Sequence, residues 1–355
     1  MNVSILPSVI HVSPLTNIRR ERRLPFPGTV SARVNERVQA QDVVAEAEPA
    51  RRRIFIDVAR ALGVSEAQAE RHMRKQAGDR VDAGDVIAGP VGMARRTLRA
   101  PAGGRIVRVS EGRVLLEALG QPMQLRAGFP GLVVSTDGVQ SVIIETAGAL
   151  VQGVWGNGKQ EFGVMRIAVE GPGEPLREEM LDIGTRGAIL VAGVCTDHEP
   201  LSLAAEMRLR GLILGGLDSD LIPVANQQPY PIVVLEGFGE RPINGPAYEV
   251  LVSSTGREVM LDARPIRSYD EHRPEVIIPL VAGRRLEPPT EVVPLAIGVR
   301  VHVLRPPHEG AVGLVKQLPS QATTFPSGVM ARCATVNIEG VGEASIPLAN
   351  LEIIP

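Results

Sequence analysis

Residues 78–109, GDRVDAGDVIAGPVGMARRTLRAPAGGRIVRV, form the stretch that most restricts how this chain can fold. Asp79 and Asp85 flank Gly84, and a glycine at that point lets the backbone turn with a positive φ angle. Apolar residues recur around the turn, and Pro101 interrupts the chain before a second apolar run begins. The pattern predicts short β-strands joined by tight turns, as in a small β-barrel.

The same stretch resembles the second half of a biotinyl/lipoyl-like barrel-sandwich hybrid, in which a GDxVxxGDxIA turn leads through a hairpin to an APxxGxI strand. Carriers in that family hold biotin or lipoate on a lysine at the hairpin tip. The matching tip here, residues 92–96, reads GMARR. An arginine stays protonated and is a poor nucleophile. We therefore expect the barrel without an attached group, and we expect no other cofactor.

An earlier segment repeats this theme, because VNERVQAQDVVA at 34–45 parallels GDRVDAGDVIA at 78–88. Two similar halves are expected to pair into one barrel, so the sequence predicts a barrel-sandwich hybrid over residues 25–119. Residues 1–24 precede it as a strand-like arm that ends in the arginine-rich run at 19–23, which we interpret as a solvated linker.

Residues 54–76 lie between the two halves and have the spacing of two short helices. The predicted capping residues are Gly63 for the first helix, and Ser65 with Gln68 for the second. The segment resembles the helix-turn-helix of bacterial repressors. Its second helix would place Glu66 and Glu70 against phosphate-lined DNA, which is unfavourable. We expect a packing hairpin inserted in the barrel, and no sequence-specific DNA binding.

Length and composition indicate several domains rich in short strands. The chain has 355 residues, enough for two to four domains, with 37 Gly, 29 Pro and 3% aromatic residues. Residues 1–119 hold 20 Lys+Arg and 13 Asp+Glu, a net charge of +7, which leaves −9 for the remainder. This asymmetry favours an anionic partner for the N-terminal part, although a solvated arginine-rich surface explains it equally well.

Two features bear on the compartment. The cysteines, Cys195 and Cys333, are far apart and form no CxxC pair. No apolar run approaches the eighteen or so residues of a membrane span, and the first twenty residues do not have the pattern of a secretory signal. We expect a soluble protein of the reducing cytoplasm, without a membrane partner.

Residues 120–170 are predicted to form a β-rich segment. Within it, GVWGNGKQ matches the Gly-x4-Gly-Lys part of a phosphate-binding loop from Gly153 to Lys159. Gln160 replaces the Ser or Thr that would hold Mg²⁺, and a strand-like run follows where a helix is required. The alternative is a glycine turn in which Trp155 packs as a plug.

Residues 171–285 differ from the rest, because apolar runs that begin near 188, 211 and 231 alternate with helical stretches. This spacing predicts parallel βαβ units, and it loosely resembles small regulatory domains of the DRTGG kind. Ligands of a parallel sheet lie beyond its carboxyl ends. The candidate ligand-binding residues there are Gly193, Gly215, Gly216, Glu236, Gly237 and Gly239. The candidate metal ligands or acid-base groups are Cys195, Asp197, His198 and Glu199, unless this string is a polar loop that caps the next helix.

Residues 286–355 show alternating strand patterns separated by Gly and Pro turns. This part resembles the KOW-containing, SH3-like barrel of NusG-type transcription factors and some ribosomal proteins. The resemblance implies contact with RNA, ribosome or RNA polymerase, but the scarcity of aromatic residues favours a protein partner. The candidate partner-contact residues are Arg300, Arg305, His308 and Lys316.

The chain therefore reads as a mainly β multidomain protein with a central α/β domain. It contains no Ser-His-Asp set, HExxH motif or complete phosphate loop, which favours a non-catalytic interaction or scaffold protein that could associate with a ribonucleoprotein. Two alternatives remain. One is an accessory subunit of a metabolic or electron-transfer complex, because the barrel also resembles that of the C subunit of Rnf-type complexes. The other is nucleotide or metal sensing by the α/β domain.

Overall fold

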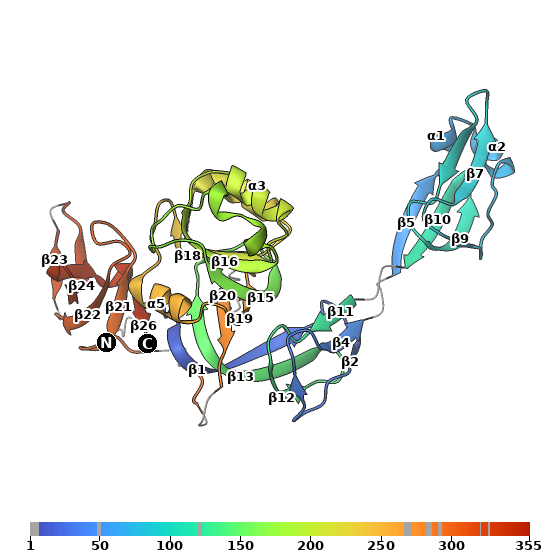
Figure 1. The fold of residues 1–355 in the computed structure, drawn as a ribbon. Helices are drawn as coiled ribbons and strands as arrows, with labels where there is room; N and C mark the ends of the chain where they lie inside the picture. The colour runs from blue at the N-terminus through green and yellow to red at the C-terminus, as the bar shows by residue number, and fades with distance from the viewer. Residues whose placement is uncertain are drawn as a thin grey trace.

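The computed structural model describes residues 7–47, 51–119, 123–265, 272–281, 286–289, 293–319, 321–325 and 327–355. The fold is mostly β, as the composition predicted, and short helices cover part of it (Figure 1). The described strands form one large mixed sheet and four smaller sheets, two of which lie in a part of the chain that stands away from the large sheet. The helices of the described residues are all too short or too polar to traverse a lipid bilayer.

The parallel half of the large sheet follows the order β18-β17-β16-β15. These strands are β15 (Gln160–Ile167), β16 (Ala188–Cys195), β17 (Gly211–Leu217) and β18 (Ile232–Phe238). The crossovers contain η1 (Glu178–Met180), η2 (Ile183–Thr185), α3 (Glu199–Glu206), η3 (Ser219–Leu221) and α4 (Ile222–Gln227). The predicted parallel pairing of the three apolar runs is confirmed.

Both faces of this half are covered, which explains why its strands are apolar without alternation. In β16, Ile189 and Val191 belong to the core under α5 (Gly245–Ser253), whereas Leu190 and Ala192 belong to the core under α3 and α4. The edge strand β14 (Trp155–Gly156) pairs with β18. The run after Lys159 is strand β15, so the glycine segment does not lead into the helix that a phosphate loop requires.

An antiparallel half continues the sheet through β19 (Glu258–Asp262), β20 (Glu275–Pro279) and the long strand β13 (Ser141–Gln152). On one edge, β13 pairs with β20 and then with β12 (Gly131–Thr136); on the other it pairs with β1 (Val12–Arg23) along almost its whole length. The arginine run at 19–23 therefore lies inside a strand, and the prediction of a solvated linker is wrong. Burial alternates along β1, so that Ile18 and Arg22 face inward.

The far ends of β1, β12 and β13 belong to a small barrel. It is completed by β2 (Thr29–Val30), β3 (Arg37–Val38), β4 (Val43–Ala47) and β11 (Met123–Arg126). Strand β3 pairs with β12, and β4 pairs with β11 and β2. Val44, Phe129 and Ile144 lie in the shared core. None of the described strands from 25–47 pairs with a strand from 51–119, so the prediction that the two echoing segments form one barrel is wrong.

Residues 51–119 instead form a separate module, inserted into the β4–β11 hairpin (Figure 1). Its strands are β5 (Arg51–Asp57), β6 (Arg80–Val81), β7 (Val86–Val91), β8 (Arg96–Arg99), β9 (Gly104–Ser110) and β10 (Arg113–Leu119). Ala47 is the Cα partner of Met123, and Arg51 is the partner of Leu119, so the chain enters and leaves the module side by side. The module has its own core, and Figure 1 shows it standing away from the rest of the protein.

Local turn and cap predictions in the module are confirmed. Gly84 has φ +89° and Gly63 ends α1 (Val58–Leu62) in the left-handed conformation. The Ser65 N–H donates to Gln68 Oε1 at 3.4 Å, which is half of the predicted capping box before α2 (Glu66–Arg71). Residues 54–57, predicted to be helical, are in β5 because they pair with β10. Val58, Leu62 and Ala69 pack the helix pair into the module core.

The C-terminal unit is a curled six-stranded sheet. It contains β21 (Arg300–Val303), β22 (Val312–Gln317), β23 (Ala322–Thr324), β24 (Met330–Ile338), β25 (Gly342–Pro347), η4 (Leu348–Asn350) and β26 (Leu351–Ile354). Residues 8–10 run along β26, where Ile10 N donates to Ile353 O at 2.9 Å and Ile353 N donates to Ser8 O at 2.8 Å. Ile354 enters the core beneath α5, so this unit packs against the large sheet.

Candidate functional site

The glycines at the ends of the parallel strands serve close packing of the chain, and they do not line an open crevice. A Cβ atom on Gly193 would lie 2.5 Å from Glu174 N, and one on Gly215 would lie 2.5 Å from Arg241 O. A Cβ on Gly216 would collide with Gly239 O. Backbone segments at 173–174 and 239–243 therefore cover the strand ends at which we expected a ligand.

Glu236 is the predicted ligand residue that does face a cavity. It is buried in β18, with an exposed fraction of 6%, and Gly237 and Gly239 follow it with φ values of +128° and +95°. These two conformations are accessible mainly to glycine, and they fold the chain back so that Asn244 reaches the Glu236 carboxylate. Asn244 donates to Glu236 Oε1 from its backbone N–H at 3.1 Å and from its side chain at 2.6 Å.

The CTDHEP string does not assemble into a metal site. Cys195 is buried, its thiol donates to Asp197 O at 3.3 Å, and burial raises the pKa of that thiol to about 12. His198 and Glu199 lie at 3.3 Å from one another on the exposed start of α3. A neutral buried thiol is a poor metal ligand, and the string instead forms the polar entry to α3, which was our alternative interpretation.

His302, which sequence reasoning did not select, lies between two glutamates from different units. It is in β21, and its Nε2 is 2.9 Å from Oε2 of Glu236 in β18. Its Nδ1 is 3.9 Å from Oε2 of Glu352 in β26. Glu352 also accepts hydrogen bonds from Arg273 Nη2 at 2.8 Å and Ser8 Oγ at 3.0 Å. We call His302, Glu236, Glu352, Arg273 and Ser8 the C-terminal cluster.

Charge pairing sets the ionisation of this cluster. Burial alone would lower the pKa of His302, but the ion pairs with the Glu236 and Glu352 carboxylates outweigh it and raise the pKa to about 9. Burial alone would raise the pKa of Glu352, but His302, Arg273 and Ser8 hold it below its usual value. The imidazole is therefore protonated and the carboxylate ionised at neutral pH.

A small cavity adjoins the C-terminal cluster. It has a volume of about 120 Å³ and is lined by Glu236, Glu240, Arg241, Pro242, His302, Val303, Leu304, Glu309 and Gly310. Sites for nucleotides and other cofactors usually offer several hundred Å³. Part of its charged lining is also paired, since Arg241 Nη2 lies 2.8 Å from Glu309 Oε1. Neither observation supports nucleotide binding in this cavity.

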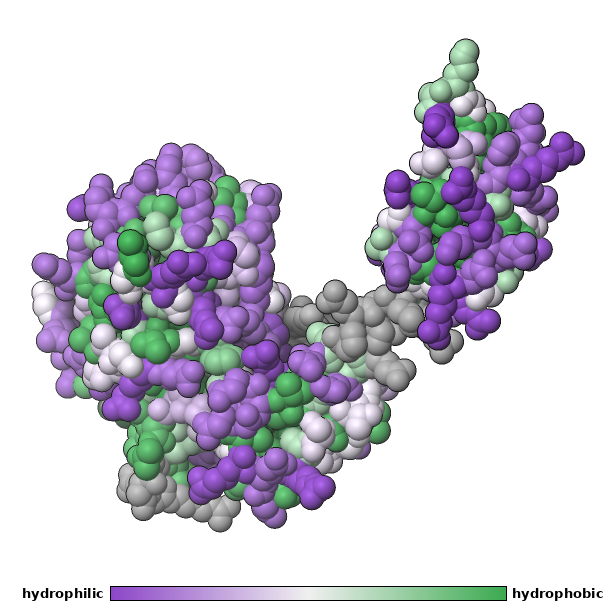
Figure 2. All heavy atoms as spheres, turned by 45° about the vertical axis from the view of Figure 1, so that its right-hand side comes forward, coloured by the Kyte–Doolittle hydropathy of each residue, from purple (hydrophilic) through white to green (hydrophobic). Residues whose placement is uncertain are grey.

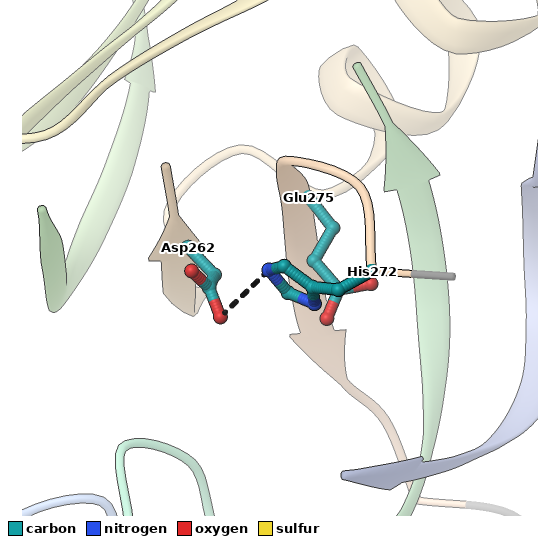
Figure 3. A group of neighbouring side chains, drawn as sticks. All are labelled: Asp262, His272 and Glu275. Carbon is teal, nitrogen blue, oxygen red and sulfur yellow. Dashed lines mark ion pairs between the residues drawn. The ribbon is translucent and has the colours of Figure 1, made fainter. Parts of the chain in front are cut away.

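A second buried group joins the large sheet to the small barrel. Asp262 ends β19, Glu275 begins β20, and His272 stands between them with its Nε2 3.5 Å from Asp262 Oδ2 (Figure 3). One ligand atom from each residue lies within 4.8 Å of the others, the geometry of a potential metal site. This is the only such trio among the described residues.

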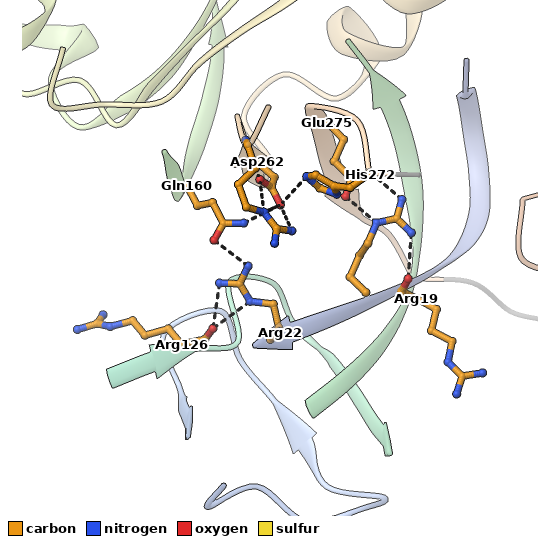
Figure 4. A network of polar contacts seen from close by, with 9 residues as sticks. Arg19, Arg22, Arg126, Gln160, Asp262, His272 and Glu275 are labelled. Atoms are coloured by element: carbon orange, nitrogen blue, oxygen red, sulfur yellow. Dashed lines mark hydrogen bonds and ion pairs between the residues drawn. The ribbon is translucent and has the colours of Figure 1, made fainter. Parts of the chain in front are cut away.

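Arginines already neutralise both carboxylates of this trio (Figure 4). Arg20 donates to both oxygens of Glu275 at 2.6 Å, and Arg264 makes a bidentate contact with Asp262, with Nη2 at 2.7 Å. Burial alone would raise the pKa of Asp262, but His272 and Arg264 hold it well below its usual value. A divalent cation would have to displace these guanidinium groups and stand beside them, which Coulomb repulsion opposes. The trio is therefore better suited to a structural network than to a metal.

Arg22 extends the network into the small barrel. Its Nη1 donates to Gln160 Oε1 at 3.1 Å, and Gln160 Nε2 donates to Asp262 Oδ2 at 2.6 Å. Two further Arg22 nitrogens donate to Arg126 O at 3.3 Å, at the end of β11. Burial lowers the pKa of Arg22 to about 10, with Asp262 opposing that effect. We call Arg20, Arg22, Gln160, Asp262, Arg264, His272 and Glu275 the junction cluster.

Sequence reasoning missed the junction cluster, although one signal was present. Asp262 and Glu275 interrupt or border apolar strand runs, VMLDA and EVIIP. A charge inside a buried strand requires a buried partner. That signal identifies the carboxylates, but it cannot identify Arg20 or Arg22, which are more than 200 residues away in the chain.

The predicted partner-contact residues divide into two groups. Arg300 and Lys316 are exposed on strands β21 and β22, and Arg305 is exposed in the loop between them. His308 is half-buried in a turn of the C-terminal unit. The next residue in this turn, Glu309, forms an ion pair with Arg241, which lies in the loop that covers the strand ends of the large sheet. This turn therefore faces the interior of the protein.

Trp155 packs edge-on against Phe238, with ring centroids 6.1 Å apart, as the plug interpretation of the glycine segment predicted.

Comparison with known proteins does not assign this chain to a family. No family model matches this chain, and no curated protein matches it in sequence.

Proposed function

We propose that this chain is a non-catalytic interaction protein, in which a locked body presents the 51–119 module to a partner. The body comprises the large sheet, the small barrel and the C-terminal sheet. The observation that carries the proposal is the ionisation of the two buried clusters. Their groups link different units, and His302, Asp262 and Glu352 among them are each held in one charge state around neutral pH.

Acid-base catalysis at neutral pH works best with a group whose pKa lies near 7. His302 has a pKa of about 9, Arg22 about 10 and Cys195 about 12. Asp262 and Glu352 are shifted the other way and stay ionised. His302, Asp262 and Glu352 therefore hold their charges in ion pairs, Arg22 keeps its positive charge and Cys195 stays neutral, so none of these groups exchanges protons near neutrality.

Residues 272–275 support the idea of a locked body. His272 faces Asp262 of β19, Arg273 bonds Glu352 of β26, and Glu275 bonds Arg20 of β1. Adjacent side chains of one short segment thus hold three parts of the protein. Breaking one partner of a buried ion pair leaves an uncompensated charge, so such contacts favour a single arrangement of the units.

The way in which the 51–119 module is inserted supports the proposal that it is the part that contacts the partner. The chain segments that enter and leave the module lie side by side, because Ala47 pairs with Met123 before the module and Arg51 pairs with Leu119 at its start. The module therefore extends from a hairpin without interrupting the body. We also propose that the module is a barrel-sandwich-type domain, because its β7–β8 hairpin projects an exposed tip with Met93 fully exposed. By the same reasoning, the six-stranded C-terminal sheet fits an SH3-like barrel.

The test is a deletion designed on the β4–β11 pairing. Residues 48–122 are replaced by Asn-Gly, which can close the hairpin between Ala47 and Met123 as a two-residue turn. Full-length and shortened proteins are then cross-linked to partners in native cells, and the cross-links are mapped by mass spectrometry. We expect cross-links concentrated in 51–119, and we expect the folded shortened protein to lose that partner.

Two results would contradict the proposal. One is full retention of the partner by the shortened protein, which would place binding on the body. The other is a substrate turned over by the purified protein at a rate that Asp262→Asn or His302→Gln abolishes while the fold persists. Circular dichroism and thermal unfolding of the shortened protein establish that the body remains folded.

A further inference from the structure

We propose that the outer face of the β5-β10-β9-β6 sheet binds single-stranded RNA. The inference rests on the proposed role of the 51–119 module as the partner-binding part, and it names the partner. We call this surface the basic face. It is defined by Arg53, Phe55, Arg80, Arg105, Arg108, Arg113 and Leu115.

The strand register brings these residues together. In β10, Val114 and Leu116 are buried in the module core, so Arg113 and Leu115 must point to the opposite side. Leu115 is the Cα partner of Phe55 in β5 and of Arg108 in β9. The next row along the strands places Arg53, Glu117, Arg105 and Arg80 side by side.

An exposed aromatic ring stands in the middle row. Phe55 is 77% exposed, although it lies in a regular strand. Leu115 beside it is half-buried, and Arg108 lies beyond Leu115 on the same face. Val107, the extra residue of the bulge in β9, is 46% exposed. A flat ring on a solvated sheet is a stacking platform for an unpaired base, as in sheet-based RNA-binding modules.

The charge of this face complements a phosphate chain. Five exposed arginines share it with two acidic residues, Asp57 and Glu117. The Asp57 carboxylate is occupied as the cap of α1, where it accepts from Arg60 N at 2.9 Å. Arg105 is held in place by its 3.2 Å hydrogen bond to Gly78 O. The face therefore offers several guanidinium groups around one ring.

Charge distribution over the whole chain points to the same face. Residues 51–119 hold 14 Lys+Arg and 8 Asp+Glu, a net charge of +6, so the rest of the chain carries −8. A polyanion is repelled by the body and attracted to the module. In Figure 2, hydrophilic side chains cover much of the visible surface of the module, with apolar patches between them.

The type of basic residue favours RNA over an acidic peptide. Of the 14 basic residues in the module, 13 are arginine and one is Lys75. Guanidinium groups are planar, contact phosphates in a bidentate manner and stack on bases. A sheet with an exposed ring cannot enter the narrow major groove of an RNA duplex, whereas it can stack an unpaired base. We therefore expect a preference for single strands.

The experiment measures binding of the full-length protein to a fluorescent uridine 20-mer by anisotropy. The same measurement with the duplex form, with a thymidine 20-mer of DNA and with polyglutamate tests the alternatives. We expect the RNA single strand to bind more tightly than the duplex and polyglutamate. Phe55→Ala should weaken binding by about tenfold, because one base loses its stacking partner.

Arg108→Gln with Arg113→Gln should reduce the slope of log affinity against log salt by about 1.4, as roughly 0.7 is expected for each phosphate contact with a single strand. The matched control is Arg166→Gln with Arg332→Gln, two exposed strand arginines outside the module, which should leave the slope unchanged. Phe55 is exposed, so its replacement should preserve the fold, and thermal unfolding checks this.

Equal binding of duplex and single strand, tighter binding of the DNA strand or of polyglutamate, or an unchanged affinity in Phe55→Ala would overturn the RNA assignment. These outcomes are separate from failure of the proposed function. If the module is cross-linked to a protein partner and RNA does not bind, only the RNA assignment fails. If the shortened protein keeps every partner, both fail.

Discussion

Arg273 donates a hydrogen bond of 2.8 Å from Nη2 to Oε1 of Glu352, across 79 residues of chain. Arg273 precedes β20 in the large sheet, and Glu352 lies in the last strand of the C-terminal sheet. Both side chains are largely buried, with exposed fractions of 19% and 4%. This pair therefore connects two units at a point where water cannot replace either partner well, and it is the most direct target for testing how the body is held together.

Arg273→Gln should lower the free energy of unfolding by about 2–4 kcal/mol, because it leaves the Glu352 carboxylate buried with less compensation. Chemical denaturation followed by circular dichroism measures the change. Arg257→Gln is the matched control, since Arg257 is exposed, and it should change stability by less than about 0.5 kcal/mol. Equal effects of the two substitutions would show that the pair does not hold the units together.

The stability of the body should fall as the pH rises toward and through 9. The pKa of His302 is raised to about 9 in the fold, above its ordinary value of 6.5. Its stabilising contribution is therefore complete below about pH 6.5 and is lost as the pH passes the folded value. The loss is roughly 3 kcal/mol at most. Thermal unfolding at pH 6.5 and 9.5 should show this loss of stability. The His302→Gln variant should be less stable than the unaltered protein at pH 6.5, and its stability should change less between the two pH values.

Asp262 and Arg264 should respond unequally to substitution, although they form one salt bridge. Asp262→Asn removes a carboxylate that is only 2% exposed and leaves Arg22 buried without a nearby anion, so we expect a loss of about 3 kcal/mol or more. The side chain of Arg264 is 41% exposed. Arg264→Gln should lower the stability by less, because Gln160 still donates a hydrogen bond to Asp262 and His272 still lies beside its carboxylate. A larger loss for Arg264→Gln would contradict this account of the junction cluster.

Gly216→Ala should destabilise the large sheet, since the added Cβ would collide with Gly239 O in the loop that covers the strand ends. A well-packed backbone can move little, and overpacking typically costs about 1–3 kcal/mol. Gly245→Ala is the control, because a Cβ there meets nothing within 4 Å and its φ is not positive. Thermal unfolding distinguishes them. The alternative outcome is that Gly216→Ala displaces the loop and leaves the stability unchanged. In that case, hydrogen exchange of the backbone at 239–243 will increase.

Gly313→Val should destabilise the C-terminal sheet through crowding. A Cβ on Gly313 would lie 2.6 Å from Asn337 O and 2.6 Å from Val336 Cγ1 in the neighbouring strand. Left-handed backbone occurs instead at Gly310, with φ +80°. We expect a loss of a few kcal/mol for Gly313→Val, measured by denaturation. An unchanged midpoint would show that β22 and β24 can separate without cost.

Short-range features of this protein were determined by the sequence alone. Gly84 turns with positive φ, Gly63 ends a helix, and Ser65 with Gln68 begins the next one, because each depends on residues a few positions apart. The parallel strands that begin near 188, 211 and 231 were also predictable. Burial on both faces requires unbroken apolar runs, and that requirement is visible in the sequence.

Long-range pairing was decided only by the tertiary structure. The two echoing segments at 34–45 and 78–88 have the same local pattern, yet β4 pairs with β11 and β6 pairs with β9. Local pattern specifies a strand and its inward face, but not the distant strand that completes the barrel. The structure resolved this by placing the second segment in an inserted module.

The same limit applies to the buried charges. The arginine run at 19–23 looks like a solvated linker in sequence, and the fold turns Arg22 inward because β1 pairs with β13 along the junction. Glu275 and Asp262 are acceptable inside the sheet only because Arg20 and Arg264 reach them there. Whether a charged side chain meets water or a buried partner depends on which segments cover it, and only the folded chain determines that.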